Sequence, residues 1–164
     1  AIELDPKYAQ AYLNRGVARM LRDAELAAKD FGAAIKIVPG YADAYANRAL
    51  ARLALNDREG GLRDLDEAIR LNPRHALAFQ NRAVVRLQNR EFRQAKEDLD
   101  SVIRLKPQDP DPWYIRALVG EGEGDADRAI QDCSRALSLA RPGWSNKDRA
   151  EDLLARLRRN KPPR

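Results

Sequence analysis

The sequence predicts an all-α solenoid of four antiparallel helix pairs followed by a C-terminal capping helix. The main observation is a short segment, an aromatic residue followed by a polar pair and a small residue, that recurs at offsets of 33 or 34 residues. A proline closes each unit, and small residues recur in step with the aromatics. A fixed period of this size indicates units that bury their apolar faces against stacked neighbours. The four copies begin at Tyr12, Tyr45, Phe79 and Trp113, and the fourth is weaker because Ile115 replaces the asparagine of the polar pair.

The pattern within each repeat predicts two helices. The first helix carries the aromatic residue, and the second carries Ala, Leu and Ile at helical spacing. We expect first helices near 9–21, 42–54, 76–88 and 110–121, and second helices near 25–37, 58–71, 92–105 and 126–139. Pro39, Pro73 and Pro107 follow second helices, where a missing N–H no longer breaks a helical hydrogen bond. The short connections between helices force neighbouring helices to run antiparallel.

Small residues recur where two helices must approach closely. They form three rows, one on the first helices and two on the second helices, and the large aromatics lie one turn before the first row. Large and small side chains that alternate in step predict close helix packing. The rows are Gly16, Ala49, Ala83 and Ala117; Ala27, Gly61, Ala95 and Ala129; and Ala34, Ala68, Val102 and Ala136.

On these positions the chain resembles the tetratricopeptide repeat (TPR) family, with repeats of the bacterial type. That pattern has an aromatic residue, a small residue four later, two alanines seven apart in the second helix, and a closing proline. The second unit matches it with Tyr45, Ala49, Gly61, Ala68 and Pro73. The resemblance covers about residues 8–141 and implies a right-handed superhelix. Gly61 and Val102, which replace alanines of the pattern, keep the size class roughly.

The same period sets the expected domain boundaries. Residues 1–143 hold four TPR units at about 8–40, 41–74, 75–108 and 109–142, and residues 1–6 match the end of a preceding unit. Residues 144–160 fall outside the period and carry an apolar stripe from Trp144 to Leu157. Such a stripe predicts a helix that covers the last unit of a solenoid. We expect residues 161–164 to be a disordered tail.

Composition argues against several classes of function. The net charge is +5, and residues 144–164 carry four of these five charges, so the repeats are nearly neutral and offer no basic groove for nucleic acid. No apolar run is long enough to predict a transmembrane helix or a membrane partner. We expect a buried structural thiol at Cys133, a surface loop residue at His75, no metal site, no cofactor and no enzyme activity. The compartment, cytoplasmic or periplasmic, is left open.

Charged residues also follow the period. Each arginine of the first row precedes an aspartate of the second helix by 15 or 16 residues, which is enough to cross one helical hairpin. This spacing predicts bidentate arginine–aspartate pairs between the two helices of each repeat. An anion-binding arginine ladder is the alternative, although matched aspartates would neutralise it. The rows are Arg15, Arg48, Arg82 and Arg116; Arg19, Arg52 and Arg86, interrupted by Gly120; and Asp30, Asp64, Asp98 and Asp132.

The TPR resemblance implies that the first helices line a concave, partner-binding groove. An apolar stripe edged by amides suits an extended peptide or a partner helix, because asparagine both donates to and accepts from peptide backbone. The alternative is that the amides bond neighbouring repeats and the apolar rows belong to the core. The candidate residues are Leu13, Asn14, Val17, Asn47, Leu50, Gln80, Asn81, Val84, Tyr114 and Leu118.

The sequence therefore predicts a scaffold or adaptor for a protein partner. We expect no clamp for the acidic C-terminal peptide of heat-shock chaperones, because only Asn47 matches the residue types of that clamp. The positions compared are Leu13, Val17, Asn47, Leu77 and Asn81. Two alternatives remain: an RNA reader built from helical repeats, and a self-assembly module in which the uncapped first unit, with Ile2 and Leu4, meets a second copy.

Overall fold

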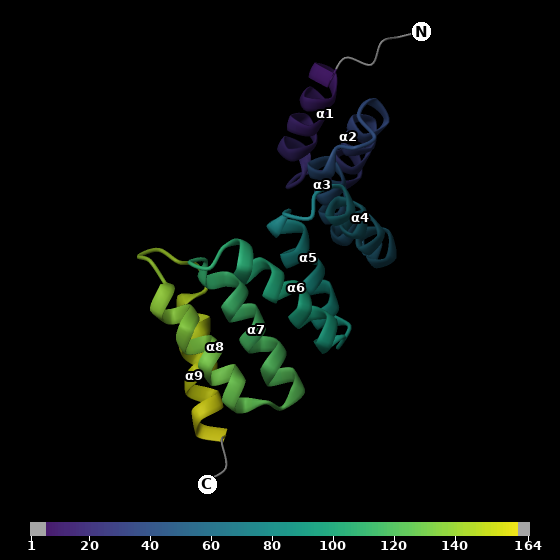
Figure 1. Ribbon diagram of the computed structural model, residues 1–164. Coiled ribbons are helices and arrows are strands. Elements are labelled where there is room, and N and C mark those ends of the chain that lie inside the picture. The colour runs from purple at the N-terminus through teal and green to yellow at the C-terminus, as the bar shows by residue number, and fades with distance from the viewer. Residues whose placement is uncertain (1–5, 161–164) are drawn as a thin grey trace. The chain divides into compact units, whose positions relative to one another are not determined.

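The computed structural model describes residues 6–160, and this part of the chain forms nine α-helices and no strand (Figure 1). This confirms the all-α class and the position of each paired helix. Two helices differ at their ends: α1 begins and ends earlier than expected, and α7 continues past Gly122 to Glu123. The helices are α1 (Pro6–Arg19), α2 (Ala24–Ile37), α3 (Ala42–Ala54), α4 (Arg58–Leu71), α5 (Ala76–Gln88), α6 (Phe92–Leu105), α7 (Pro110–Glu123), α8 (Ala126–Leu139) and α9 (Lys147–Asn160).

Helix ends lie where short polar side chains can satisfy backbone groups. Asp57 and Asp125 cap α4 and α8 by accepting from the backbone N–H three residues later. Asp109 caps α7, and Pro110 occupies its first turn, where a missing N–H costs nothing. At the other end, α7 stops at Gly124, whose φ of 81° is the left-handed conformation that glycine adopts readily.

The chain divides into two compact units, residues 1–81 and 82–164, and the boundary falls within α5. In the first unit α1 packs on α2, α2 on α3, and α3 on α4. Phe31 of α2 is fully buried, and a Cβ added at Gly16 of α1 would lie 2.6 Å from its ring. The small residue at this position is therefore what allows the two helices to approach.

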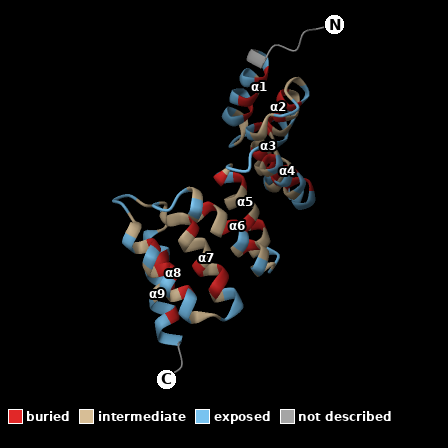
Figure 2. Cartoon of the chain, viewed as in Figure 1, coloured by how far each residue is buried: buried red, intermediate tan, exposed pale blue. Residues whose placement is uncertain are grey.

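The second unit contains the rest of α5 and helices α6 to α9. Its inner cluster joins Ala83, Ala95, Leu99 and Val119, and buried segments alternate with exposed ones along the helices (Figure 2). The three predicted rows of small residues are buried in both units. No helix in residues 6–160 has the length and apolar character that crossing a bilayer requires.

Helix α9 covers the last helix pair of the second unit. Ala150, Leu153 and Leu157 are buried against Ala117 of α7 and Cys133 of α8, so the predicted apolar stripe faces the core. The preceding loop is fixed as well. Trp144 meets the Tyr114 ring edge to face at a centroid distance of 6.1 Å, and its Nε1 donates to Asp111 Oδ1 at 2.7 Å.

Candidate functional site

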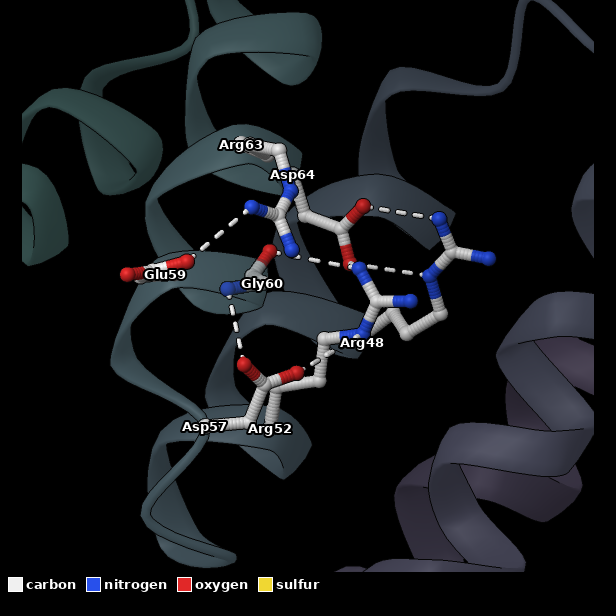
Figure 3. Close-up of polar contacts among 7 residues, drawn as sticks. All are labelled: Arg48, Arg52, Asp57, Glu59, Gly60, Arg63 and Asp64. Carbon is white, nitrogen blue, oxygen red and sulfur yellow. Dashed lines mark hydrogen bonds and ion pairs between the residues drawn. The ribbon is translucent and has the colours of Figure 1, made fainter.

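An aspartate of the second helix in each repeat accepts a bidentate pair of hydrogen bonds from an arginine of the first helix. In the second repeat, Arg48 Nε donates to Asp64 Oδ2 at 2.8 Å and Nη2 donates to Oδ1 at 2.7 Å (Figure 3). The same two contacts, at 2.6–3.0 Å, confirm the prediction in the other three repeats. These pairs are Arg15–Asp30, Arg82–Asp98 and Arg116–Asp132.

A second arginine, one helical turn further along the first helix, reaches the same carboxylate in the first three repeats. Arg52 Nη1 donates to Asp64 Oδ2 at 2.8 Å and to the Gly60 carbonyl oxygen at 3.2 Å (Figure 3). Arg19 and Arg86 donate to Asp30 and Asp98 over the same distance. This second donor was not predicted, because the spacing of 15 or 16 residues pairs one arginine with each aspartate.

We call each such group an arginine–aspartate cluster. The four carboxylates are 2–9% exposed, and a charge buried this deeply is costly unless charged hydrogen bonds compensate it. The arginines are held from the other side as well, because the Arg48 guanidinium lies 5.4 Å from the centre of the Tyr45 ring and Arg116 lies 4.8 Å from Trp113. The bidentate forks thus serve internal carboxylates, which argues against the anion-binding ladder.

The clusters also shift the pKa values of some of their members. The hydrogen bond from Arg15 lowers the pKa of Asp30, and the charges of Arg15 and Arg19 add to the effect against the opposing influence of burial. In the partner groups, the hydrogen bond from Asp64 raises the pKa of Arg48, and the one from Asp132 raises the pKa of Arg116. Both partners are therefore held in their charged forms.

The fourth cluster is built differently. Gly120 occupies the place of the second arginine, so within the described chain Asp132 accepts from Arg116 alone. The remaining Nη1 of Arg116 donates to Asp100 of the preceding repeat at 2.5 Å. Arg116 is therefore shared between two carboxylates, whereas Asp30, Asp64 and Asp98 each have two arginines.

Helices α1 and α3 carry five of the residues expected to line a groove. The expectation that Leu13 lines the groove is wrong, because Leu13 is only 9% exposed and lies in the core with Ala9 and Phe31. Val17 is 51% exposed, Asn14 is exposed, and Asn47 and Leu50 are half-buried.

The amides of these residues do not bond neighbouring repeats. Asn14 accepts from Gln10 at 2.9 Å, and Asn47 Nδ2 donates to the Asp43 carbonyl oxygen at 2.8 Å, in each case within one helix. The alternative in which these two amides hold adjacent repeats together is therefore wrong.

The remaining candidates lie on α5 and α7. Gln80, Asn81 and Val84 of α5 are half-buried, and Asn81 Nδ2 is a buried donor with no partner in the described residues. Tyr114 and Leu118 of α7 pack against the cluster that α9 completes, so the core uses much of their surface.

Cys133 and His75 lie outside the groove and the clusters. Cys133 is fully buried, as predicted; its Sγ lies 3.0 Å from the Ala150 carbonyl oxygen, and burial raises the pKa of its thiol. His75 is not a surface residue, because its side chain is only 9% exposed. Its Nδ1 accepts from the Ala78 N–H at the start of α5, and its Nε2 lies 3.0 Å from Asp43 Oδ1. A capping role of this kind leaves little trace in a loop sequence.

The helix pairs, the buried rows and the repeat length define a TPR fold, and solved structures share it. PilF of Pseudomonas aeruginosa aligns with a TM-score of 0.83 at 19% identity, over 92% of this chain and 68% of that chain. The thermophilic TPR protein TTC0263 of Thermus thermophilus gives a TM-score of 0.77 at 21% identity, over 92% and 84%. The first TPR of Spaghetti (RPAP3), bound to the HSP90 peptide SRMEEVD, gives 0.71 at 19% identity, over 76% and 99%.

Family membership comes from the sequence itself. The family model of the ETO1 C-terminal domain matches residues 5–160, and the chain belongs to that family. A comparison with curated proteins gave no significant match.

The second cluster predicts strong energetic coupling between Arg48 and Asp64. We expect Asp64→Ala to reduce the free energy of unfolding by about 3 kcal/mol, because it leaves two guanidinium groups without their carboxylate. The coupling energy between Arg48→Ala and Asp64→Ala, from urea denaturation of the single and double variants, should reach about 1–3 kcal/mol.

The matched control is the exposed pair Arg63 and Glu59 on α4, whose atoms lie 3.5 Å apart (Figure 3). Its coupling energy should stay below about 0.5 kcal/mol. Additive losses at Arg48 and Asp64 would show that the bidentate geometry contributes no coupling.

The first cluster predicts a pH dependence. Because the pKa of Asp30 is lowered in the folded state, its ionised form stabilises the fold above the ordinary value of 3.8, and this contribution is lost as the pH falls through the lowered pKa. A ¹³C NMR titration should find the Asp30 carboxylate still mostly ionised at pH 3.8.

Removing the main cause should raise that pKa. We expect Arg15→Gln to move the titration midpoint of Asp30 upward, whereas Lys29→Gln, which removes an exposed cation paired with Glu25, should leave it in place. A wild-type midpoint at or above 3.8 would contradict the role assigned to Arg15.

Proposed function

We propose that this domain is a protein-interaction module that holds an extended peptide or a partner helix against its first helices. The observation that carries the proposal is the part of α1 and α3 that neither the core nor the clusters use. We call it the first-helix surface, and it consists of Asn14, Val17, Asn47 and Leu50.

This surface has the chemistry that peptide binding needs. Helical spacing places Asn14 and Val17 on one side of α1 and Arg15 and Arg19 on another, so cluster formation leaves the former pair exposed. Exposed amides can exchange hydrogen bonds with peptide backbone, while Val17, which is 51% exposed, offers apolar contact. Gln80, Asn81 and Val84 remain candidates for the same role on α5.

The comparisons support the general class of function. The first TPR of Spaghetti has this fold and is bound to an HSP90 peptide. The present chain has only Asn47 among the residue types of the chaperone clamp, and Leu13, one of the compared positions, lies in the core. We therefore propose a peptide that differs from the acidic chaperone terminus.

The test uses a displayed peptide library selected on the whole chain, followed by titration calorimetry with the enriched peptides. We expect Val17→Asp and Asn47→Ala each to weaken binding about tenfold or more, which corresponds to about 1.4 kcal/mol. Arg63→Ala is the control, because that side chain is exposed on α4, away from the first helices.

Two results would contradict the proposal. One is a selection that enriches no peptide. The other is a set of enriched peptides that bind Val17→Asp and Asn47→Ala as tightly as the wild type.

Self-association is a second candidate, and exposed apolar side chains near α1 favour it. Leu21 is 98% exposed, Tyr8 is 65% exposed and Leu26 is 41% exposed. Large apolar side chains that remain exposed can contribute to contacts between copies of a chain. Ile2 and Leu4, on which the sequence-based version rested, lie outside the described residues.

Light scattering across a concentration series tests this candidate. A wild-type mass that rises with concentration, and returns to the monomer value in Tyr8→Ser/Leu21→Ser, would support it. A monomer throughout the series would exclude it.

A further inference from the structure

The fourth repeat contains a polar cavity at the place where the second arginine is missing. The cavity has a volume of about 440 Å³ and lies among α6, α7 and α8 of the second unit. Its wall includes Lys96, Asp100, Arg116, Gly120, Glu123 and Asp132. We call it the fourth-repeat pocket.

The other repeats indicate which group the pocket lacks. In the first three repeats a guanidinium from Arg19, Arg52 or Arg86 donates to the buried carboxylate at 2.8 Å. Gly120 supplies no side chain at the equivalent position, and the cavity is bordered by both Gly120 and Asp132. Each repeat thus has a buried carboxylate that can accept a second guanidinium. In the first three repeats a second arginine of the first helix donates to it, and in the fourth repeat no second residue of that helix does.

Local charge favours a cation in this position. A cluster of two arginines and one aspartate carries a net charge of +1, as around Asp64, whereas Arg116 with Asp100 and Asp132 carries −1. The other ions of the wall have partners of their own: Lys96 pairs with Glu123 at 2.7 Å, Arg93 with Glu97 at 4.0 Å, and Arg128 with Asp125 at 3.3 Å. The negative charge left over therefore lies at the two carboxylates that share Arg116.

We propose that the fourth-repeat pocket receives the arginine side chain of a partner polypeptide, whose guanidinium takes the place that Arg52 has in the second repeat. An arginine is the expected occupant because the equivalent place holds an arginine in each of the first three repeats, and in the second repeat its Nη1 reaches both Asp64 and the Gly60 carbonyl oxygen. Asp132 and the carbonyl oxygen of Arg128 occupy the corresponding positions in the fourth repeat.

This site is separate from the groove candidates on α7. Residues 116, 120 and 123 line the pocket, whereas the groove candidates of the same helix are Tyr114 and Leu118. On an α-helix these two sets point to different sides, because successive residues are rotated by about 100°. The inference therefore goes beyond the proposed function, and the variants that test each are different.

The test is an NMR titration of the ¹⁵N-labelled chain with N-acetyl-arginine methylamide, and with the citrulline analogue as a neutral control of the same shape. We expect saturable shifts at the Gly120 amide and the Arg116 Nε–H, with a dissociation constant on the order of 1 mM and at least tenfold weaker binding of citrulline. The Arg48 Nε–H, whose cluster is already filled, should not respond.

Variants at one position provide the second arm. Gly120→Arg should fill the pocket from within and abolish the shifts of Arg116, while Gly120→Ala should keep them. Both variants add a Cβ that would lie 3.2 Å from that of Ala129, so the alanine form controls for the local adjustment this requires. If Gly120→Arg does not fold, Arg52→Ala replaces it, because it should open a matching site at which the probe shifts the Arg48 Nε–H.

Three results would overturn the proposal. The first is no saturable shift at Gly120 and Arg116 at probe concentrations up to about 20 mM, well above the expected dissociation constant. The second is equal binding of the arginine and citrulline probes. The third is binding that persists unchanged in a folded Gly120→Arg variant.

Discussion

The buried aspartate of each second helix is the constraint on which the rest of the structure depends. Rows of alanine allow helices to approach but do not specify how far one helix slides along another, because apolar contact is not directional. A carboxylate such as Asp64, enclosed on both sides, is stable only where the Arg48 fork meets it in plane. A shift of one residue along either helix would rotate it by about 100° and leave a buried charge unpaired. The clusters therefore set the register of each hairpin.

The same constraint divides the surface of the first helices. In the first repeat, Arg15 and Arg19 turn toward α2, and Phe31 fills the space that Gly16 leaves. What remains exposed on α1 is the side that carries Asn14 and Val17. A partner that binds there contacts residues the hairpin does not need for its own stability, so binding specificity can vary without loss of the fold.

Much of this architecture could be predicted from the sequence because each structural position occurs four times, once in every repeat. The positions of proline and of the small residues predicted the helices. The spacing between arginine and aspartate predicted the bidentate pairs. The second arginine was missed because the rows were paired one to one, although a carboxylate has enough lone pairs to accept from two forks. Leu13 was misplaced because spacing defines a helix face but not the angle at which that face meets its neighbour. His75 was misjudged because its role in capping α5 depends on local backbone geometry.

The fourth repeat shows how a binding site can arise by removing a side chain from a structural cluster. Loss of the second arginine at Gly120 would leave Arg116 and Asp132 under-supported, but Arg116 gains Asp100 of the preceding repeat. The second repeat differs, because the position of the first repeat that is equivalent to Asp100 is Gly32, which has no carboxylate. There Arg52, from the same hairpin, donates to Asp64 instead. A cluster can thus be completed by a second cation from its own hairpin or by a second anion from the repeat before. Only the fourth repeat lacks the second arginine of its own hairpin and has a cavity bordered by the buried aspartate, and this is why the fourth repeat, rather than the first three, can accept a cation from outside the chain.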